Sequence, residues 1–204
     1  MTTAVVIGDS YCTQPSPFWA TMAARLGWTV TANAYGGTGY ATDSTPYYRY
    51  GDASRVLSVV AAAPDVVLIT GGINDAATGA QAGVQAGCTS LIASLQSGLP
   101  LALIIVVAPF APIANGWYAL EVTREAVVTA AMTAGVELID PMGTGWPSAK
   151  SWITGTGNVG TPLGDGNADV YTLSDNAHPT LAGRAYIGTR LAFAIKPPAT
   201  GLDY

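Results

Sequence analysis

The sequence predicts an α/β protein: a three-layer α/β/α sandwich whose five-stranded parallel sheet has the flavodoxin-like order 2-1-3-4-5. Short β-branched runs alternate with longer Ala-rich stretches along the chain. Two of the short runs are continuously apolar, as is typical of strands buried on both faces of a parallel sheet. No repeat or linker divides the chain, so we expect one domain over residues 1–196 and a tail or linker remnant at residues 197–204.

Each element has a local signal. Apolar or alternating runs that end at glycine, proline or polar residues predict strands at residues 4–8, 28–34, 65–70, 101–108 and 136–139. Ala-rich stretches with a proline near the first turn, or a glycine or proline after the last, predict helices at residues 18–26, 53–62, 81–96, 119–134 and 179–194. Residues 142–174, rich in Gly, Thr, Asn and Pro, break the alternation. We expect a functional loop there, in which a two-stranded ribbon is an open alternative.

The composition excludes several classes of protein. Half of the residues are apolar and only 10% are charged, compared with about 25% charged in an average soluble domain. The chain therefore has material for a large core, and intrinsic disorder is excluded. Eight Lys and Arg against 13 Asp and Glu give a net charge of −5. This charge argues against a nucleic-acid partner, which needs a basic surface.

Membrane insertion and secretion also lack a signal. The longest apolar run, residues 99–108, falls short of the roughly 20 residues that cross a bilayer, and the amino terminus does not resemble a signal peptide. We therefore expect no membrane insertion, and a location in the cytoplasm or within a phage particle or larger assembly. The two cysteines, Cys12 and Cys88, are expected to be free thiols. The oligomeric state stays open.

The single histidine, His178, is the first candidate catalytic residue. Asp175 lies three residues upstream, where a tight turn lets its carboxylate accept a hydrogen bond from the imidazole Nδ1–H. Pro179 follows His178 and places it on a loop at the start of the last predicted helix. A base oriented by a carboxylate is half of a nucleophile-activating system.

The other half is expected at the carboxyl end of the first strand, where Gly8-Asp9-Ser10 follows the apolar run. Gly8 permits a sharp exit from the strand, and Ser10 is expected to cap the next helical region with its own backbone N–H free. Cys12 is a rival nucleophile, but nothing near it in the sequence lowers its pKa.

Two further loops follow the second and third predicted strands: the glycine-rich residues 36–39, and Gly71-Gly72-Ile73-Asn74-Asp75. In the order 2-1-3-4-5 these loops flank Ser10 at the switch point of the sheet. A glycine N–H and the Asn74 amide are donors of the kind that stabilise an oxyanion. Asp9 and Asp75 are expected to hold the loops by hydrogen bonds rather than to act as acids.

In these blocks the sequence resembles the SGNH hydrolases, also called GDSL-type esterases and lipases. The resemblance rests on Gly8-Asp9-Ser10, the glycine loop, Gly72-Ile73-Asn74-Asp75 and Asp175-Asn176-Ala177-His178-Pro179, which appear in the order of the family. It implies Ser10 as nucleophile, His178 as general base and then acid, and Asp175 as the orienting acid. It also implies no metal and no cofactor.

The resemblance further implies an oxyanion hole made of the Ser10 N–H, a glycine N–H and the Asn74 side chain. The glycine block is offset from the family pattern, so either Gly37 or Gly39 is expected to supply the glycine donor, with Gly39 preferred. Tyr11 stands where the family motif often has Leu, a change that we do not expect to matter.

The predicted function is that of a serine esterase acting on a small-molecule or glycan ester, with short-chain acyl or carbohydrate O-acetyl groups preferred. Aromatic residues in the loops near the site, notably Tyr40 and Trp152, are candidates for substrate binding, although for any one of them filling of the loop interior is the favoured interpretation. The alternatives are a lipase or thioesterase, a carbohydrate-binding appendage with weak or lost hydrolysis, and a flavodoxin-like nucleotide binder that uses the glycine loop.

Overall fold

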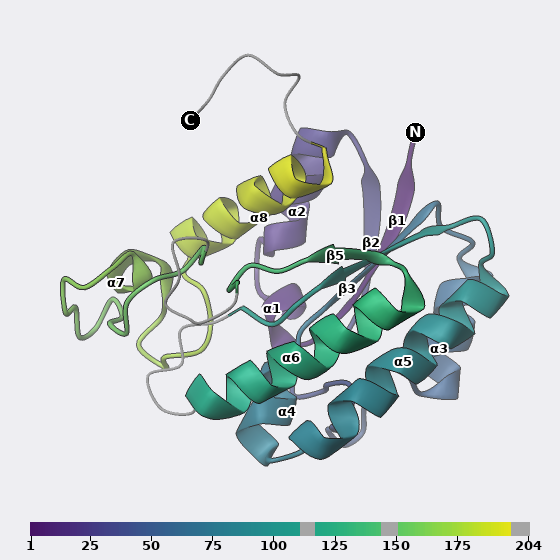
Figure 1. The fold of residues 1–204 in the computed structure, drawn as a ribbon. Coiled ribbons are helices and arrows are strands. Elements are labelled where there is room, and N and C mark those ends of the chain that lie inside the picture. The colour runs from purple at the N-terminus through teal and green to yellow at the C-terminus, as the bar shows by residue number, and fades with distance from the viewer. Residues whose placement is uncertain (111–116, 144–150, 197–204) are drawn as a thin grey trace.

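The computed structural model describes residues 1–110, 117–143 and 151–196. Its ribbon has three layers, with helices on both faces of a central sheet (Figure 1). In the described residues, five parallel strands pair in the order β2-β1-β3-β4-β5, which confirms the predicted topology. The strands are β1 (Thr3–Gly8), β2 (Thr29–Ala34), β3 (Val66–Thr70), β4 (Leu103–Val107) and β5 (Glu137–Ile139).

Two layers of helices cover the sheet (Figure 1). One face carries α2 (Phe18–Leu26) and α8 (Leu181–Ile195), and the other carries α3 (Ala53–Ala61), α5 (Gln81–Gly98) and α6 (Trp117–Ala134). The sequence does not predict the short helices α1 (Ser10–Thr13), α4 (Ile73–Thr78) and α7 (Ala168–Tyr171). Helices of four to six residues are too short to display a 3.6-residue periodicity. No helix in the described ranges is both long and apolar enough to span a bilayer.

The core consists of two clusters, one on each face of the sheet, because successive residues of a strand point to opposite faces. Val6 of β1 packs in the cluster that contains Met22 of α2 and Ile187 of α8. Its neighbour Ile7 packs in the other cluster, which contains Leu91 of α5. All five side chains are at most 1% exposed. Burial on both faces explains why the strands appear in the sequence as continuous apolar runs.

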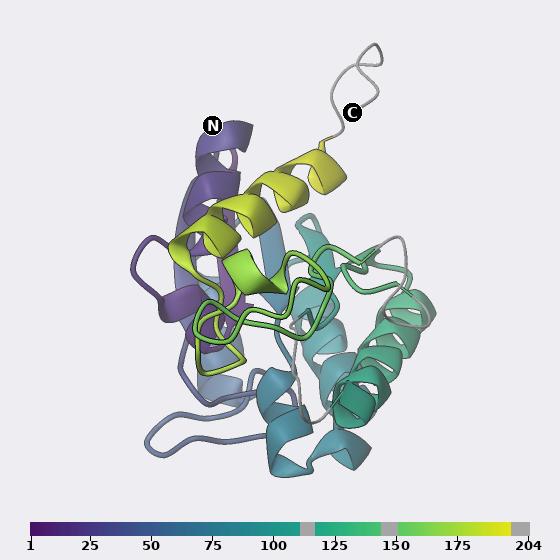
Figure 2. The same ribbon diagram turned by 90° about the vertical axis from the view of Figure 1, so that its left-hand side faces the viewer.

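The carboxyl ends of the strands form one edge of the sheet, where the segments after β1, β2 and β3 converge. α1 follows β1 with Asp9 between them, and α4 follows β3 after two glycines. Figure 2 faces this edge, with the amino-terminal end of α8 close to α1 and the green segment that includes α7 lying across the middle.

The loop-rich segment predicted at residues 142–174 is ordered by its own hydrogen bonds where the structure describes it. Asn158 accepts from the N–H groups of Gly160 and Thr161, and Asp165 accepts from Thr156. In residues 151–174 the structure has α7 and isolated bridges rather than a two-stranded ribbon. Residues 144–150, and the tail predicted at residues 197–204, lie outside the described residues.

Candidate active site

Ser10 and His178 meet at the carboxyl edge of the sheet, with Ser10 Oγ 2.8 Å from His178 Nε2, although they are 168 positions apart in the sequence. The exit from β1 requires a glycine, because a Cβ atom on Gly8 would overlap the sulfur of Cys12. Ser10 is predicted to cap the next helical region, but it lies inside the short helix α1; Asp9 is the N-cap, and its carboxylate accepts from the N–H of Tyr11 at 3.0 Å. Ser10 is therefore the first helical residue, and its N–H donates to no described residue.

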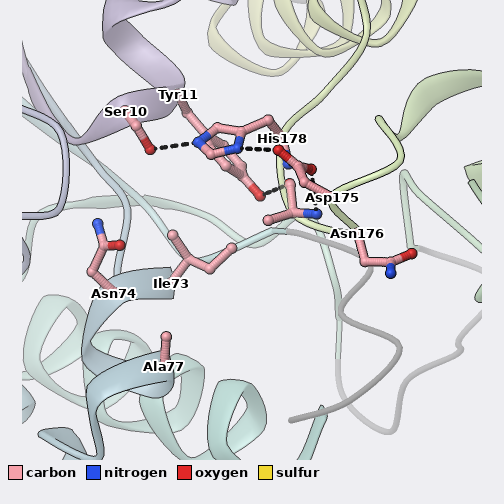
Figure 3. Close-up of a pocket in the computed structure, with 9 residues that line it drawn as sticks. Ser10, Tyr11, Ile73, Asn74, Ala77, Asp175, Asn176 and His178 are labelled. Atoms are coloured by element: carbon pink, nitrogen blue, oxygen red, sulfur yellow. Dashed lines mark hydrogen bonds and ion pairs between the residues drawn. The ribbon is translucent and has the colours of Figure 1, made fainter.

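Asp175 orients the imidazole from the opposite side (Figure 3). Its Oδ2 lies 2.7 Å from His178 Nδ1, and its Oδ1 accepts from the N–H groups of Ala177 and His178, both at 2.9 Å. The turn closes because Asn176 has a left-handed backbone, with φ of 60°. Partial burial raises the pKa of Asp175, but the hydrogen bonds from Ala177 and His178 outweigh it and bring the pKa below its ordinary value. The carboxylate is thus charged, and the Nδ1–H···Oδ2 hydrogen bond directs Nε2 toward Ser10.

Asn74 reaches the same place from α4, with its side chain pointing toward Ser10 (Figure 3). One of its two amide N–H groups donates to the carbonyl of Thr38 at 2.8 Å, which leaves a second donor on the same nitrogen. That contact also ties α4 to the glycine loop. The predicted donors Ser10 and Asn74 therefore lie on the same side of the cavity.

The expectation for Gly39 is not supported. Its N–H donates to the carbonyl of Thr42 at 2.9 Å, and a Cβ atom on it would overlap the carboxylate of Asp75. Among the described residues, no hydrogen bond engages the N–H of Gly36 or Gly37. Gly36 lies beside Ser10, since its Cβ position is 3.8 Å from the Ser10 Cβ. Gly37, which the sequence analysis named, and Gly36, which it did not name, are therefore the candidate glycine donors, because the packing of the loop determines which N–H stays free.

Asp9 and Asp75 hold the loops, as predicted. Asp9 accepts from the Tyr50 hydroxyl at 3.0 Å, and burial raises the pKa of Asp9 to about 6. Asp75 accepts from the N–H groups of Tyr40 and Ala41 at 2.9 Å, and burial raises the pKa of this carboxyl as well. Both carboxylates anchor the chain around Ser10.

Arg55 of α3 is a structural residue that the sequence analysis missed. Its guanidinium is buried and donates to the carbonyl groups of Gly8 and Asn33 and to the hydroxyl of Thr38. It thereby links the ends of β1 and β2 to the glycine loop. The only signal in the sequence was the arginine itself, which stands alone among the apolar and small residues of this predicted helix. A charged residue in such a helix is buried only when partners neutralise or hydrogen-bond it.

A cavity of about 300 Å³ opens beside Ser10 and His178. Its apolar walls come from Tyr11, Ile73 and Ala77, which Figure 3 shows around the Ser10–His178 pair. Cys12, the rival nucleophile, is buried, and burial raises the pKa of its thiol well above the ordinary value. Cys12 and Cys88 are both free thiols, as predicted. Among the described residues, no three His, Cys, Asp or Glu side chains are grouped so as to hold a metal ion.

The two aromatic residues predicted to bind substrate do not line this cavity. Tyr40 is 1% exposed and packs edge-on against Tyr50, and Trp152 is 7% exposed beside Phe110. Buried rings present no face to a substrate, so a substrate-contacting role is not supported for Tyr40 or Trp152. These rings fill the interior of Gly-rich loops, which offer few other apolar side chains.

Comparisons with known proteins found a matching family model and solved structures of similar fold. Residues 3–186 match the model of the GDSL-like lipase/acylhydrolase family, and a search of curated protein sequences finds no match. The crystal structure of TesA is similar at 19% identity and a TM-score of 0.70, covering 96% of this chain and 98% of that chain. A putative lipolytic protein of the G-D-S-L family from Desulfitobacterium hafniense is similar at 18% identity and a TM-score of 0.69, covering 95% and 99%. A carbohydrate acetylesterase from Sinorhizobium meliloti is similar at 15% identity and a TM-score of 0.66, covering 96% and 98%.

Proposed function

The chain is an ester hydrolase of the GDSL-like lipase/acylhydrolase family, and we propose that it is a serine esterase that removes short acyl groups, such as O-acetyl groups, from a carbohydrate. The proposal rests above all on one observation, the continuous set of contacts from Ser10 through His178 to Asp175, at 2.8 and 2.7 Å. This set pairs a hydroxyl with a base, and the base with a group that orients it.

In the proposed reaction, Ser10 Oγ attacks the acyl carbon while His178 Nε2 takes the hydroxyl proton. The carbonyl oxygen becomes an oxyanion, which accepts hydrogen bonds from the N–H of Ser10, the free amide N–H of Asn74 and the N–H of Gly36 or Gly37. The intermediate collapses, the ester C–O bond breaks, and the leaving alkoxide takes the proton from Nε2. Water then attacks the acyl-Ser10 ester while His178 accepts its proton. That proton returns to Ser10 Oγ as the carboxylic acid leaves.

The size of the cavity favours short acyl groups. Its volume of about 300 Å³ lies at the lower end of the roughly 300–1,000 Å³ that is usual for ligand pockets. An aromatic pair with one exposed ring supports a carbohydrate as the alcohol. Tyr47 is 45% exposed and stacks on Tyr35 with ring centroids 4.6 Å apart, and Tyr35 directly precedes Gly36 of the glycine loop. The similarity to a carbohydrate acetylesterase points the same way.

The test is hydrolysis of p-nitrophenyl acetate and of acetylated sugars by the unsubstituted protein and by Ser10→Ala, His178→Ala and Asn74→Ala. We expect Ser10→Ala and His178→Ala to abolish turnover, and Asn74→Ala to lower kcat about 10²- to 10³-fold, because one oxyanion donor is lost. Ser97→Ala, an exposed serine on α5, is the matched control.

Activity that persists in Ser10→Ala or His178→Ala would contradict the mechanism. Faster turnover of long-chain acyl esters or thioesters than of acetyl esters would favour a lipase or thioesterase. Slow labelling of Ser10 by a fluorophosphonate, together with sugar binding, would favour a binding appendage.

A further inference from the structure

Tyr11, the residue after Ser10, crosses from α1 to the turn that carries His178. Its hydroxyl donates to the carbonyl of Ala177, the residue before His178. Its ring lies against the imidazole, with ring centroids 5.5 Å apart and planes at 56°. The side chain is 5% exposed. The Tyr11 side chain therefore links helix α1, which carries Ser10, to the turn that carries His178.

The contact acts on one peptide unit, the bond between Ala177 and His178. The N–H of this unit donates to Asp175 Oδ1 at 2.9 Å, and its carbonyl accepts from the Tyr11 hydroxyl. Both polar ends of the unit are thus held, and the orientation of this peptide sets the direction in which the His178 side chain leaves the backbone.

Several other hydrogen bonds lie within the turn and fix its shape. The Asp175 carboxylate accepts from the N–H groups of Ala177 and His178, and the N–H of Leu173 donates to the carbonyl of His178. These partners all belong to the same turn. Asn158 holds the turn from the loop side, since its amide donates to Asn176 Oδ1 at 2.6 Å. Tyr11 holds it from the side of Ser10.

The hydroxyl of Tyr11 is protonated at neutral pH and is therefore available as a donor. Burial, together with the negative charges of Asp9 and Asp175, raises the pKa of Tyr11 well above its ordinary value. A phenol that stays protonated donates to a carbonyl without titrating.

We propose that Tyr11 is a positioning residue: its hydroxyl and ring hold the imidazole of His178 at hydrogen-bond distance from Ser10. This inference rests on the proposed function. It assigns a role to the residue that the sequence analysis did not expect to matter.

The experiment compares Tyr11→Phe, which keeps the ring and removes only the hydroxyl, with Tyr40→Phe. Tyr40 is a matched control because it is equally buried but packs in the core cluster on the other face of the sheet. For Tyr11→Phe with p-nitrophenyl acetate we expect kcat to fall about 10- to 100-fold, because small displacements of a catalytic group have effects of this size. We expect KM and the thermal unfolding temperature to stay close to those of the unsubstituted protein, and Tyr40→Phe to change none of these quantities.

A second measurement does not depend on turnover. His178 is the only histidine in the chain, so the imidazole Nδ1–H signal in an NMR spectrum is assigned without ambiguity. We expect that signal to be sharp in the unsubstituted protein and in Tyr40→Phe, and to broaden or shift in Tyr11→Phe as the imidazole loses its fixed position.

Two outcomes would overturn the inference, and they differ from each other. If Ser10→Ala abolishes turnover while Tyr11→Phe keeps full kcat and an unchanged imidazole signal, Tyr11 only fills the core and the proposed function stands. If the unsubstituted protein hydrolyses no ester and a fluorophosphonate does not label Ser10, the proposed function fails, and the positioning role fails with it.

Discussion

Asp175 and His178 make two separate contacts, one through the imidazole and one through the backbone. Asp175 Oδ2 lies 2.7 Å from Nδ1, while Oδ1 accepts from the His178 N–H at 2.9 Å. Three residues of separation permit both contacts because Asn176 between them has a left-handed backbone. The same carboxylate therefore shapes the turn and orients the base, and a substitution can separate the two roles.

Asp175→Asn is expected to keep the turn and lose the orientation. The amide oxygen can still accept from the backbone N–H groups, but the amide nitrogen now faces Nδ1 and favours the tautomer that carries its proton on Nε2. We expect kcat to fall about 10²- to 10⁴-fold, as when the orienting carboxylate of a serine hydrolase is neutralised. Steady-state rates with p-nitrophenyl acetate measure the loss. Asp65→Asn, at the residue before β3, is the control and should keep full activity. An Asp175→Asn variant with near-normal kcat would refute the orienting role.

The glycine loop offers a matched pair of substitutions. In Gly39→Ala the new methyl group overlaps the Asp75 carboxylate, which holds the N–H groups of Tyr40 and Ala41. We expect a loss of about 2–4 kcal/mol in the free energy of unfolding, because buried hydrogen bonds to a carboxylate are disrupted. In Gly36→Ala the methyl group meets only the Ser10 Cβ, at 3.8 Å.

Gly36→Ala is therefore expected to change the free energy of unfolding by less than about 1 kcal/mol, but to lower kcat because the methyl group lies beside Ser10. Urea denaturation and steady-state kinetics of both variants check the contrast. The prediction fails if Gly39→Ala is as stable as the unsubstituted protein, or if Gly36→Ala retains full activity.

The buried carboxyl of Asp9 predicts how stability depends on pH. Burial raises its pKa from 3.8 to about 6 in the folded protein, against hydrogen bonds from Tyr11 and Tyr50 that lower it. Between about pH 4 and pH 6 the folded state binds more protons than the unfolded chain. The contribution of Asp9 to stability is therefore greatest below about pH 4 and is lost as the pH rises through about 6.

Asp9→Asn removes the charge and keeps an acceptor for the Tyr11 N–H. We expect it to raise the free energy of unfolding by roughly 2–3 kcal/mol near pH 7 and to change it little near pH 4. Urea unfolding across this range is the measurement. Asp65→Asn is expected to change the free energy of unfolding in the opposite direction. Hydrogen bonds from Thr3 lower the pKa of Asp65, so removing this charge should lower stability near pH 7. A difference between Asp9→Asn and the unsubstituted protein that stays constant with pH would contradict the assignment.

Most of the fold could be predicted from the sequence, because its signals are local. The bounds of α2 agree with the prediction, and β3 lies within the predicted apolar run of residues 65–70. The meeting of Ser10 with His178 could be predicted as well, since α8, which follows His178, packs beside α2 on the sheet face near the end of β1. Single loop residues were less predictable. Gly39 packs directly against the Asp75 carboxylate. The N–H of Tyr40 donates to that carboxylate, and the Tyr40 ring is buried in the core.

The sequence by itself determined the alternation of strands and helices, and it placed a serine, an asparagine and an Asp–His pair at element ends that a parallel sheet brings to one edge. Only the tertiary structure decided which glycine N–H stays free, which aromatic rings reach the solvent, and that the Tyr11 hydroxyl meets the Ala177 carbonyl 166 residues away. Periodicity and turn preferences act over a few neighbouring residues. Exposure and hydrogen-bond partners in a loop depend instead on how segments distant in the sequence pack against one another.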